Sequence, residues 1–190
     1  MVASGFLPVT IYKNKILFLF GKEANNDDTP GWSDFVGGVD TGESIYEGGL
    51  REFTEETTGF FGNTNDVRKL VRKKGGFYKF VHDTYNIHIF KLDYDEKLID
   101  YYNKSHKFIY DNVKDHTFLK STKIFEKIEM KWFSPQEMKK RRSEFRLFYQ
   151  EILDKILKDL PKIKKFIYSK NKTRKHKSRK NNTIKYSHKS

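Results

Sequence analysis

The strongest structural signal in this chain is a predicted helix that carries several acidic residues. The segment Ser44-Ile45-Tyr46-Glu47 has the form of a capping box, in which serine and glutamate side chains bind backbone N–H groups at the start of a helix. Gly59 suits the other end, because glycine readily adopts the left-handed conformation that terminates many helices. We therefore expect a helix from about residue 45 to about residue 57.

Three of the acids share one side of this predicted helix. At about 100° of rotation per residue, Glu52, Glu55 and Glu56 fall within one arc of about 100°. Like charges at this spacing repel one another, and a bound Mg²⁺ or Mn²⁺ ion would relieve the repulsion because hard cations take carboxylate oxygens. Arg51 precedes the cluster and could brace a carboxylate or offset the charge of a phosphate. Taken alone, the triplet also fits an ordinary solvated helix face.

The residues around the triplet favour the metal-binding interpretation. Gly37 is followed after five residues by Glu43, and after seven more by residues 51–56, which read REFTEE. This pattern resembles the Nudix box, written G-x5-E-x7-R-E-U-x-E-E-x-G-U with U a bulky apolar residue, over about one eighth of the chain. One departure follows the acids, because two threonines precede Gly59 where the family has a single residue.

The resemblance implies a fold, a cofactor and a role for each residue of the box. The fold would be a Nudix-like α/β/α sandwich, and the cofactor would be Mg²⁺ or Mn²⁺. The metal ligands would be the three box acids and a backbone carbonyl: Glu52, Glu55, Glu56 and Gly37. Arg51 would orient a box glutamate, and Glu43 would support the turn into the helix. Such ions would bridge the pyrophosphate oxygens and lower the pKa of the attacking water.

The identity of the general base is left open. Glu55 is the candidate within the box, whereas some members of the family use an acid from a distant loop. Alternation along the last predicted strand places Glu126 on an apolar face and Glu129 with lysines on the other, so Glu126 ranks ahead of Glu129 as a distal acid. Gly38 and Trp32 complete the candidates for substrate contact or support of the site, and Trp32 also fits a core position.

The predicted elements follow the order strands, helix, strands, helix. We expect strands where apolar and β-branched residues dominate, in a hairpin within 5–21 and at 32–36, 77–82, 85–92 and 123–133. Ser134-Pro135 is suited to open a long C-terminal helix, whose apolar residues recur at steps of three and four up to Leu160. This order predicts an α/β fold with a mixed sheet covered by helices.

Most of the net charge of +13 belongs to the C-terminal end of the sequence. Residues 162–190 contain twelve of the 38 Lys and Arg residues and no acid, which leaves 26 basic and 25 acidic residues elsewhere. We therefore expect a nearly neutral Nudix domain at 1–161 and a flexible basic tail at 162–190. The tail could bind RNA or another polyanion or carry a nuclear address, and a plain polar extension is the alternative.

Composition also narrows the cellular setting. The chain has no cysteine, which excludes disulfides, thiol nucleophiles and cysteine-ligated zinc. No segment approaches the roughly 20 apolar residues of a membrane helix. We expect an intracellular protein, cytoplasmic or nuclear, without membrane contact, and the oligomeric state is left open.

The resemblance implies hydrolysis of a pyrophosphate bond in a nucleoside diphosphate linked to another group. A basic tail on a neutral domain favours a long polyanion, so an mRNA cap is the leading substrate hypothesis. Diphosphoinositol polyphosphates, nucleotide sugars and dinucleoside polyphosphates are the alternatives. A different class of function, a non-catalytic RNA-binding module on the same scaffold, also remains, although such a module has no need of mutually repelling carboxylates.

Overall fold

A computed structural model describes residues 1–23, 29–122 and 124–169. The tail expected at 162–190 falls outside these residues from position 170 onward. Among the described residues, no helix combines the length and the apolar character that crossing a membrane requires.

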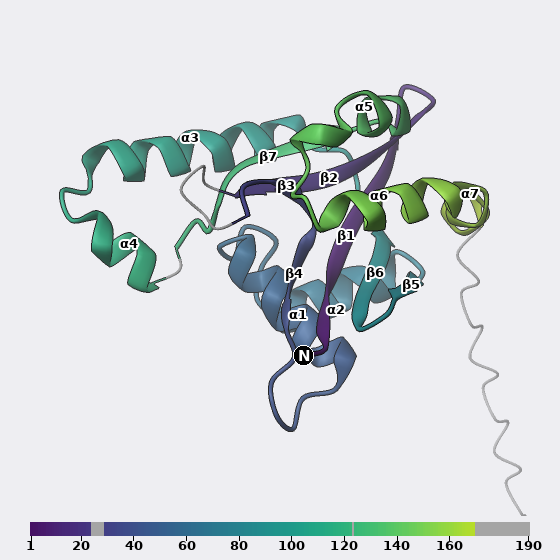
Figure 1. The fold of residues 1–190 in the computed structure, drawn as a ribbon, viewed down its shortest axis with the longest axis horizontal. Coiled ribbons are helices and arrows are strands. Elements are labelled where there is room, and N and C mark those ends of the chain that lie inside the picture. Colours follow the sequence, from purple (N-terminus) through teal and green to yellow (C-terminus); the bar gives the residue numbers. More distant parts are fainter. Residues whose placement is uncertain (24–28, 123, 170–190) are drawn as a thin grey trace, which may run out of the picture.

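A mixed seven-stranded sheet forms the centre of the protein (Figure 1). Its strands are β1 (Ala3–Tyr12), β2 (Lys15–Glu23), β3 (Gly31–Ser33), β4 (Phe35–Gly38), β5 (Phe77–His82), β6 (Tyr85–Lys91) and β7 (Lys127–Phe133). The order is β3-β2-β1-β6-β5, with β4 also pairing with β1 and β7 also pairing with β2. Strands β1 and β6 run parallel, whereas the other pairs are antiparallel. The predicted mixed sheet is confirmed.

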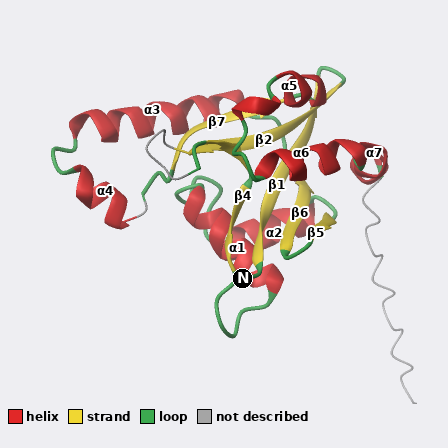
Figure 2. Cartoon of the chain, in the orientation of Figure 1, coloured by secondary structure: helices red, strands yellow, loops and turns green. Residues whose placement is uncertain are grey.

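Helices cover both faces of this sheet (Figure 2). They are α1 (Ile45–Glu56), α2 (Thr64–Lys73), α3 (Glu96–Asn112), α4 (His116–Thr122), α5 (Pro135–Lys140), the 3₁₀ helix η1 (Arg142–Glu144), α6 (Tyr149–Lys158) and α7 (Leu160–Tyr168). One core cluster joins the sheet to α1, α2 and α3 and includes Phe53 and Tyr102. The other joins the sheet to α5, α6 and α7 and includes Met138 and Ile156. The α/β/α sandwich is therefore confirmed.

The C-terminal helical region differs from the single long helix that periodicity predicts. Ser134 and Pro135 do open a helix, but the chain becomes extended at Phe145, where the backbone N–H of Arg146 donates to the carbonyl of Trp32. This contact with β3 takes the chain out of the helical conformation. A second break separates α6 from α7 near Pro161, because proline lacks the N–H that a helix interior requires.

Helix α7 continues beyond the division expected at residue 161. Its side chains Ile163 and Ile167 are buried in the same core cluster as α6. Residues 162–168 therefore pack against the sheet, and the part of the expected tail from position 170 onward lies outside the described residues.

Helices α3 and α4 extend away from the sheet, at the left of Figure 1. The amino-terminal half of α3 packs on the body of the protein through the buried side chains of Ile99 and Tyr102. The hydroxyl of Tyr102 donates to the backbone carbonyl of Lys127, 2.8 Å away, at the start of β7. This contact ties α3 to the sheet beside α1.

Candidate active site

Helix α1 forms where the capping residues predict it. The side chain of Ser44 accepts a hydrogen bond from the backbone N–H of Glu47 at 3.2 Å, and the helix ends at Glu56. Thr58 and Gly59 both follow with left-handed backbones, at φ of 51° and 68°. The hydroxyl of Thr58 also accepts from the backbone N–H of Phe125 at 3.1 Å. The additional residue before Gly59 thus makes the turn longer and links it to the segment before β7.

Arg51 is the centre of a charged network on the solvent side of α1. Its guanidinium donates to the carboxylates of Glu43, Glu52 and Glu55, and the shortest donor–acceptor distance to each is 3.0, 2.8 and 3.2 Å respectively. It also donates to the backbone carbonyl of Gly38 at 2.7 Å. The hydrogen bond from Arg51 holds the pKa of Glu43 below its usual value. Arg51, Glu43 and Gly38 therefore lie where they can orient the box acids and the turn that precedes them.

Glu52 lies directly against the backbone of Gly37 on β4. A Cβ atom at position 37 would overlap the Glu52 carboxylate, so only glycine leaves room for that carboxylate in this position. Glu55 is more open, with 42% of its side chain exposed. Gly37 and the first two box acids are thus close together, with Arg51 between the two carboxylates.

Glu56 points inward, away from the other two acids. It is only 7% exposed, and its Oε1 lies 3.1 Å from the Nζ of Lys127. Its Oε2 is buried and has no hydrogen-bond partner among the residues that the structure describes. Burial raises the pKa of Glu56 to about 8, and the neighbouring charge of Lys127 opposes that rise. The three acids share a helical arc as expected, but their side chains diverge.

Lys127 contacts the box acid Glu56, and the sequence pattern did not single it out. Strict alternation places Lys127 on the same face as Glu129, but a β-bulge shifts the register, so that Lys22 pairs with Glu129 and Glu23 pairs with Lys127. Lys127 consequently faces α1, where its ammonium also pairs with Glu23. The expectation that Glu129 and Lys127 share a face is wrong.

The remaining candidates from the sequence do not all lie near the helix that carries the box acids. Glu126 immediately precedes β7. Burial is the main cause that raises the pKa of Tyr102, the charge of Glu126 adds to that rise, and the Tyr102 hydroxyl lies beside the end of α1. Glu129 shares the sheet face of Trp32 and Arg141, opposite α1. Trp32 is 2% exposed and belongs to the core cluster on the other side of the sheet from α1. Only Glu126 of these three lies toward the box.

A second buried carboxylate lies between β3 and β4 and was not singled out from the sequence. Asp34 is buried and accepts a hydrogen bond from the hydroxyl of Tyr85 at 2.7 Å. Desolvation raises the pKa of Asp34 to about 7, although the Tyr85 hydrogen bond opposes the rise. No periodic signal distinguishes it, since Asp34 occupies the short break between two strands.

The oxygen atoms of the box carboxylates and of the Gly37 backbone suit a hard cation in two respects. Carboxylate oxygens and a backbone carbonyl are the ligands that Mg²⁺ and Mn²⁺ take. The unpartnered Oε2 of Glu56 and the space that Gly37 leaves for Glu52 are consistent with such a ligand set. In the part of the chain that the structure describes, no three acidic or histidine side chains already converge as a closed metal site.

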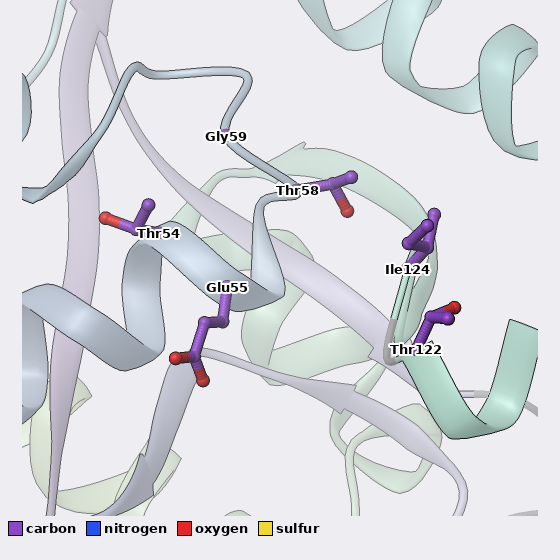
Figure 3. A pocket seen from close by; sticks show the side chains of 6 residues that line it. All are labelled: Thr54, Glu55, Thr58, Gly59, Thr122 and Ile124. Atoms are coloured by element: carbon purple, nitrogen blue, oxygen red, sulfur yellow. The ribbon is translucent and has the colours of Figure 1, made fainter.

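A pocket of about 610 Å³ opens beside Glu55 (Figure 3). It lies between the end of α1 and the segment that joins α4 to β7 and is lined by Thr54, Glu55, Thr58, Gly59, Thr122 and Ile124. Threonine hydroxyls and one aliphatic side chain make this lining partly polar and partly apolar. The pocket therefore places space for a bound group next to a box carboxylate.

Comparison with known proteins gives the following similarities. A family model described as the NUDIX domain matches residues 4–155. No curated protein sequence matches the chain. Among solved structures, an Ap4A hydrolase from C. elegans in a binary complex shares 16% identity over 85% of this chain and 99% of that chain, with a TM-score of 0.48. The Nudix hydrolase RenU from M. smegmatis shares 9% identity over 86% of this chain and 88% of that chain, with a TM-score of 0.47.

Proposed function

The chain belongs to the Nudix family, and from this premise we propose a substrate, a cofactor and a role for each residue of the site. As a Nudix pyrophosphohydrolase it hydrolyses a pyrophosphate bond. The proposed substrate is a nucleoside diphosphate linked to a second group, and the proposed cofactor is Mg²⁺ or Mn²⁺ held by Glu52, Glu55, Glu56 and the carbonyl of Gly37.

The observation that carries this proposal is the unpartnered, buried Oε2 of Glu56. Burial of a carboxylate oxygen without a partner costs free energy, and a divalent cation is the partner that offsets this cost in a site built of carboxylates. The space at Gly37 supports the same assignment, because it allows Glu52 to reach the backbone beside α1. Bound metal would supply positive charge to the pyrophosphate oxygens and acidify the attacking water.

The protein residues would then orient the substrate and accept a proton. Water attacks one phosphorus, the bridging P–O bond breaks, and the proton released from water passes to the carboxylate of Glu55. Arg51 keeps Glu52 and Glu55 in place through its guanidinium. The pocket beside Glu55 would receive one group attached to the diphosphate. Glu126 is the alternative proton acceptor, since it precedes β7 near the end of α1.

Capped RNA is the substrate we propose first, because of where the positive charge lies in the sequence. Residues 170–190 contain nine Lys and Arg residues and no acid, whereas residues 1–169 contain 29 basic and 25 acidic residues. A cationic segment attached to a less charged catalytic domain would hold the phosphates of a long RNA near the active site. Cytoplasmic or nuclear RNA would then be the partner.

The test is a metal-dependent substrate panel with the full-length protein. Capped RNA, dinucleoside polyphosphates, a nucleotide sugar and a diphosphoinositol polyphosphate are incubated with Mg²⁺, with Mn²⁺ and with a chelator, and phosphate-containing products are quantified. We expect cleavage of the capped RNA that the chelator abolishes. Preferred cleavage of the inositol compound would contradict the proposed substrate. Absence of metal-dependent products from every substrate would favour the non-catalytic RNA-binding alternative.

A further inference from the structure

Lys127 is buried between acidic side chains from two elements of the fold. It is 1% exposed, its ammonium pairs with Glu23 on β2, and its Nζ lies 3.1 Å from Oε1 of Glu56 on α1. Glu23 also accepts from Nη1 of Arg146 at 2.8 Å. Glu23 therefore lies between two bases, Lys127 and Arg146, beneath the carboxyl end of α1.

Several features of the backbone bring Lys127 to this position. The β-bulge in β7 turns its side chain toward α1. Gly21 provides the space, because a Cβ atom there would lie 2.7 and 2.9 Å from two carbons of the lysine side chain. The hydroxyl of Tyr102 fixes the lysine carbonyl at 2.8 Å. The β-bulge, the space at Gly21 and the hydrogen bond from Tyr102 therefore give the Lys127 ammonium a defined position in the fold.

The two carboxylate oxygens of Glu56 consequently have different surroundings. Oε1 contacts the ammonium of Lys127, whereas Oε2 has no hydrogen-bond partner within residues 1–23, 29–122 and 124–169. We propose that Lys127 is a positioning residue that holds Oε1, leaves Oε2 for the divalent cation and weakens the binding of that cation. This inference rests on the metal-binding role proposed above for Glu56.

The expected effect follows from the fixed charge. An ammonium and a divalent ion on the same carboxylate repel each other, and the repulsion is strong at short distance in a poorly solvated site. Lysine also neutralises part of the acid's charge when metal is absent, which stabilises the metal-free protein. Removing the ammonium should therefore destabilise the metal-free fold and strengthen metal binding. A lysine with a purely structural role would lower the melting temperature without strengthening metal binding.

The experiment compares Mn²⁺ binding by the full-length wild type, Lys127→Met and a control variant, using calorimetry and electron paramagnetic resonance. The control is Lys131→Met, which makes the same charge change on the same strand but on the face opposite α1, where Lys131 pairs with Phe20. We expect the Kd for Mn²⁺ to fall at least tenfold in Lys127→Met and to stay within twofold of wild type in Lys131→Met. Lys127→Arg, which keeps the charge, should bind Mn²⁺ as the wild type does.

An unchanged or increased Kd in Lys127→Met would overturn the proposal. If that variant does not fold without metal, the double variant Lys127→Met with Glu23→Gln removes one buried acid together with the lysine, and the same tightening is expected of it. Suppose that the wild type binds Mn²⁺, that Glu52→Gln abolishes this binding and that Lys127→Met has the wild-type Kd. This result would refute the present inference alone. Absence of such uptake in the wild type would refute the proposed metal role as well.

Discussion

The guanidinium of Arg51 donates to both carboxylate oxygens of Glu43, with Nε 3.0 Å from Oε1 and Nη2 3.1 Å from Oε2. This paired geometry requires the planar fork of arginine, and a lysine ammonium cannot reproduce it. Arg51→Lys should therefore reduce kcat/KM by about 10- to 100-fold, as loss of residues that orient metal ligands commonly does. Steady-state kinetics of anhydride hydrolysis measure this effect.

The matched control for that substitution is Arg68→Lys, because Arg68 also pairs with an acid of α1, Glu47, but outside the box. We expect the control to retain wild-type kcat/KM. If kcat/KM fell equally in both variants, the hydrogen bonds of Arg51 would have no specific role in catalysis.

Two adjacent glycines of β4 should respond very differently to a methyl group. A Cβ at Gly37 overlaps the Glu52 carboxylate, whereas a Cβ at Gly38 would lie 3.3 Å from the sulfur of Met1. Because the flexible end of Glu52 can move aside, Gly37→Ala should fold normally but displace a metal ligand, with a loss of about 10- to 100-fold in kcat/KM. Thermal melts and kinetics of Gly37→Ala and Gly38→Ala test this. Similar activity in the two variants would argue against a role for Glu52 at this position.

Glu55 is exposed enough for its charge to be removed without loss of the fold. Glu55→Gln should lower kcat by about 10² to 10⁴, the range that a general base contributes. Glu47→Gln, on the same helix, should leave kcat unchanged. If Glu55→Gln is fully active while Glu126→Gln is not, the general base is the distal acid.

Asp34 should make the protein less stable as the pH rises. Its folded pKa is about 7, against an ordinary value of 3.8, so the folded state retains a proton that the unfolded state releases between these two values. The contribution is present in full below pH 3.8 and is lost as the pH rises to about 7. At about 1.4 kcal/mol per pKa unit, the total is on the order of 4 kcal/mol.

Asp34→Asn removes this titration while its amide oxygen can still accept from Tyr85. Denaturant unfolding at pH 4.5 and pH 8 should therefore show the variant gaining stability relative to wild type at the higher pH. A constant difference between the two proteins at both pH values would contradict the raised pKa.

Deletion of residues 170–190 should separate RNA binding from catalysis. The deletion removes nine basic residues and leaves α7 intact, so RNA affinity should fall and depend less steeply on salt. Filter binding between 50 and 200 mM salt measures the slope, and cleavage of a short dinucleotide substrate should be unchanged. A loss of dinucleotide cleavage together with RNA binding would show that these residues serve the catalytic domain itself.

Residues close together in the sequence were sufficient to predict the parts of the site that form within a single segment. The capping serine and the spacing of the acids were sufficient to predict α1, and the pairing of Arg51 with the box acids follows from their neighbouring positions. The left-handed turn after α1 was also anticipated, although only the structure shows that Thr58 and Gly59 both adopt positive φ.

The missed features depend on contacts between distant segments. Lys127 faces α1 because of one extra residue in β7, and a single-residue shift reverses the face of every side chain beyond it. The C-terminal helix divides because Arg146 contacts β3, 114 residues earlier at Trp32. The periodicity of residues within one segment does not indicate which distant segment that segment will contact.

The contact between the C-terminal segment and Trp32 also has a consequence for how the polypeptide is made. Strand β3 is at the border of the sheet, and its outer side is met by Phe145 and Arg146. Until those two residues have emerged from the ribosome, the backbone N–H and C=O groups on the outer side of this edge strand can pair with a strand of another chain. Nascent chains stalled before residue 145 should accordingly self-associate, whereas chains released after α7 should not.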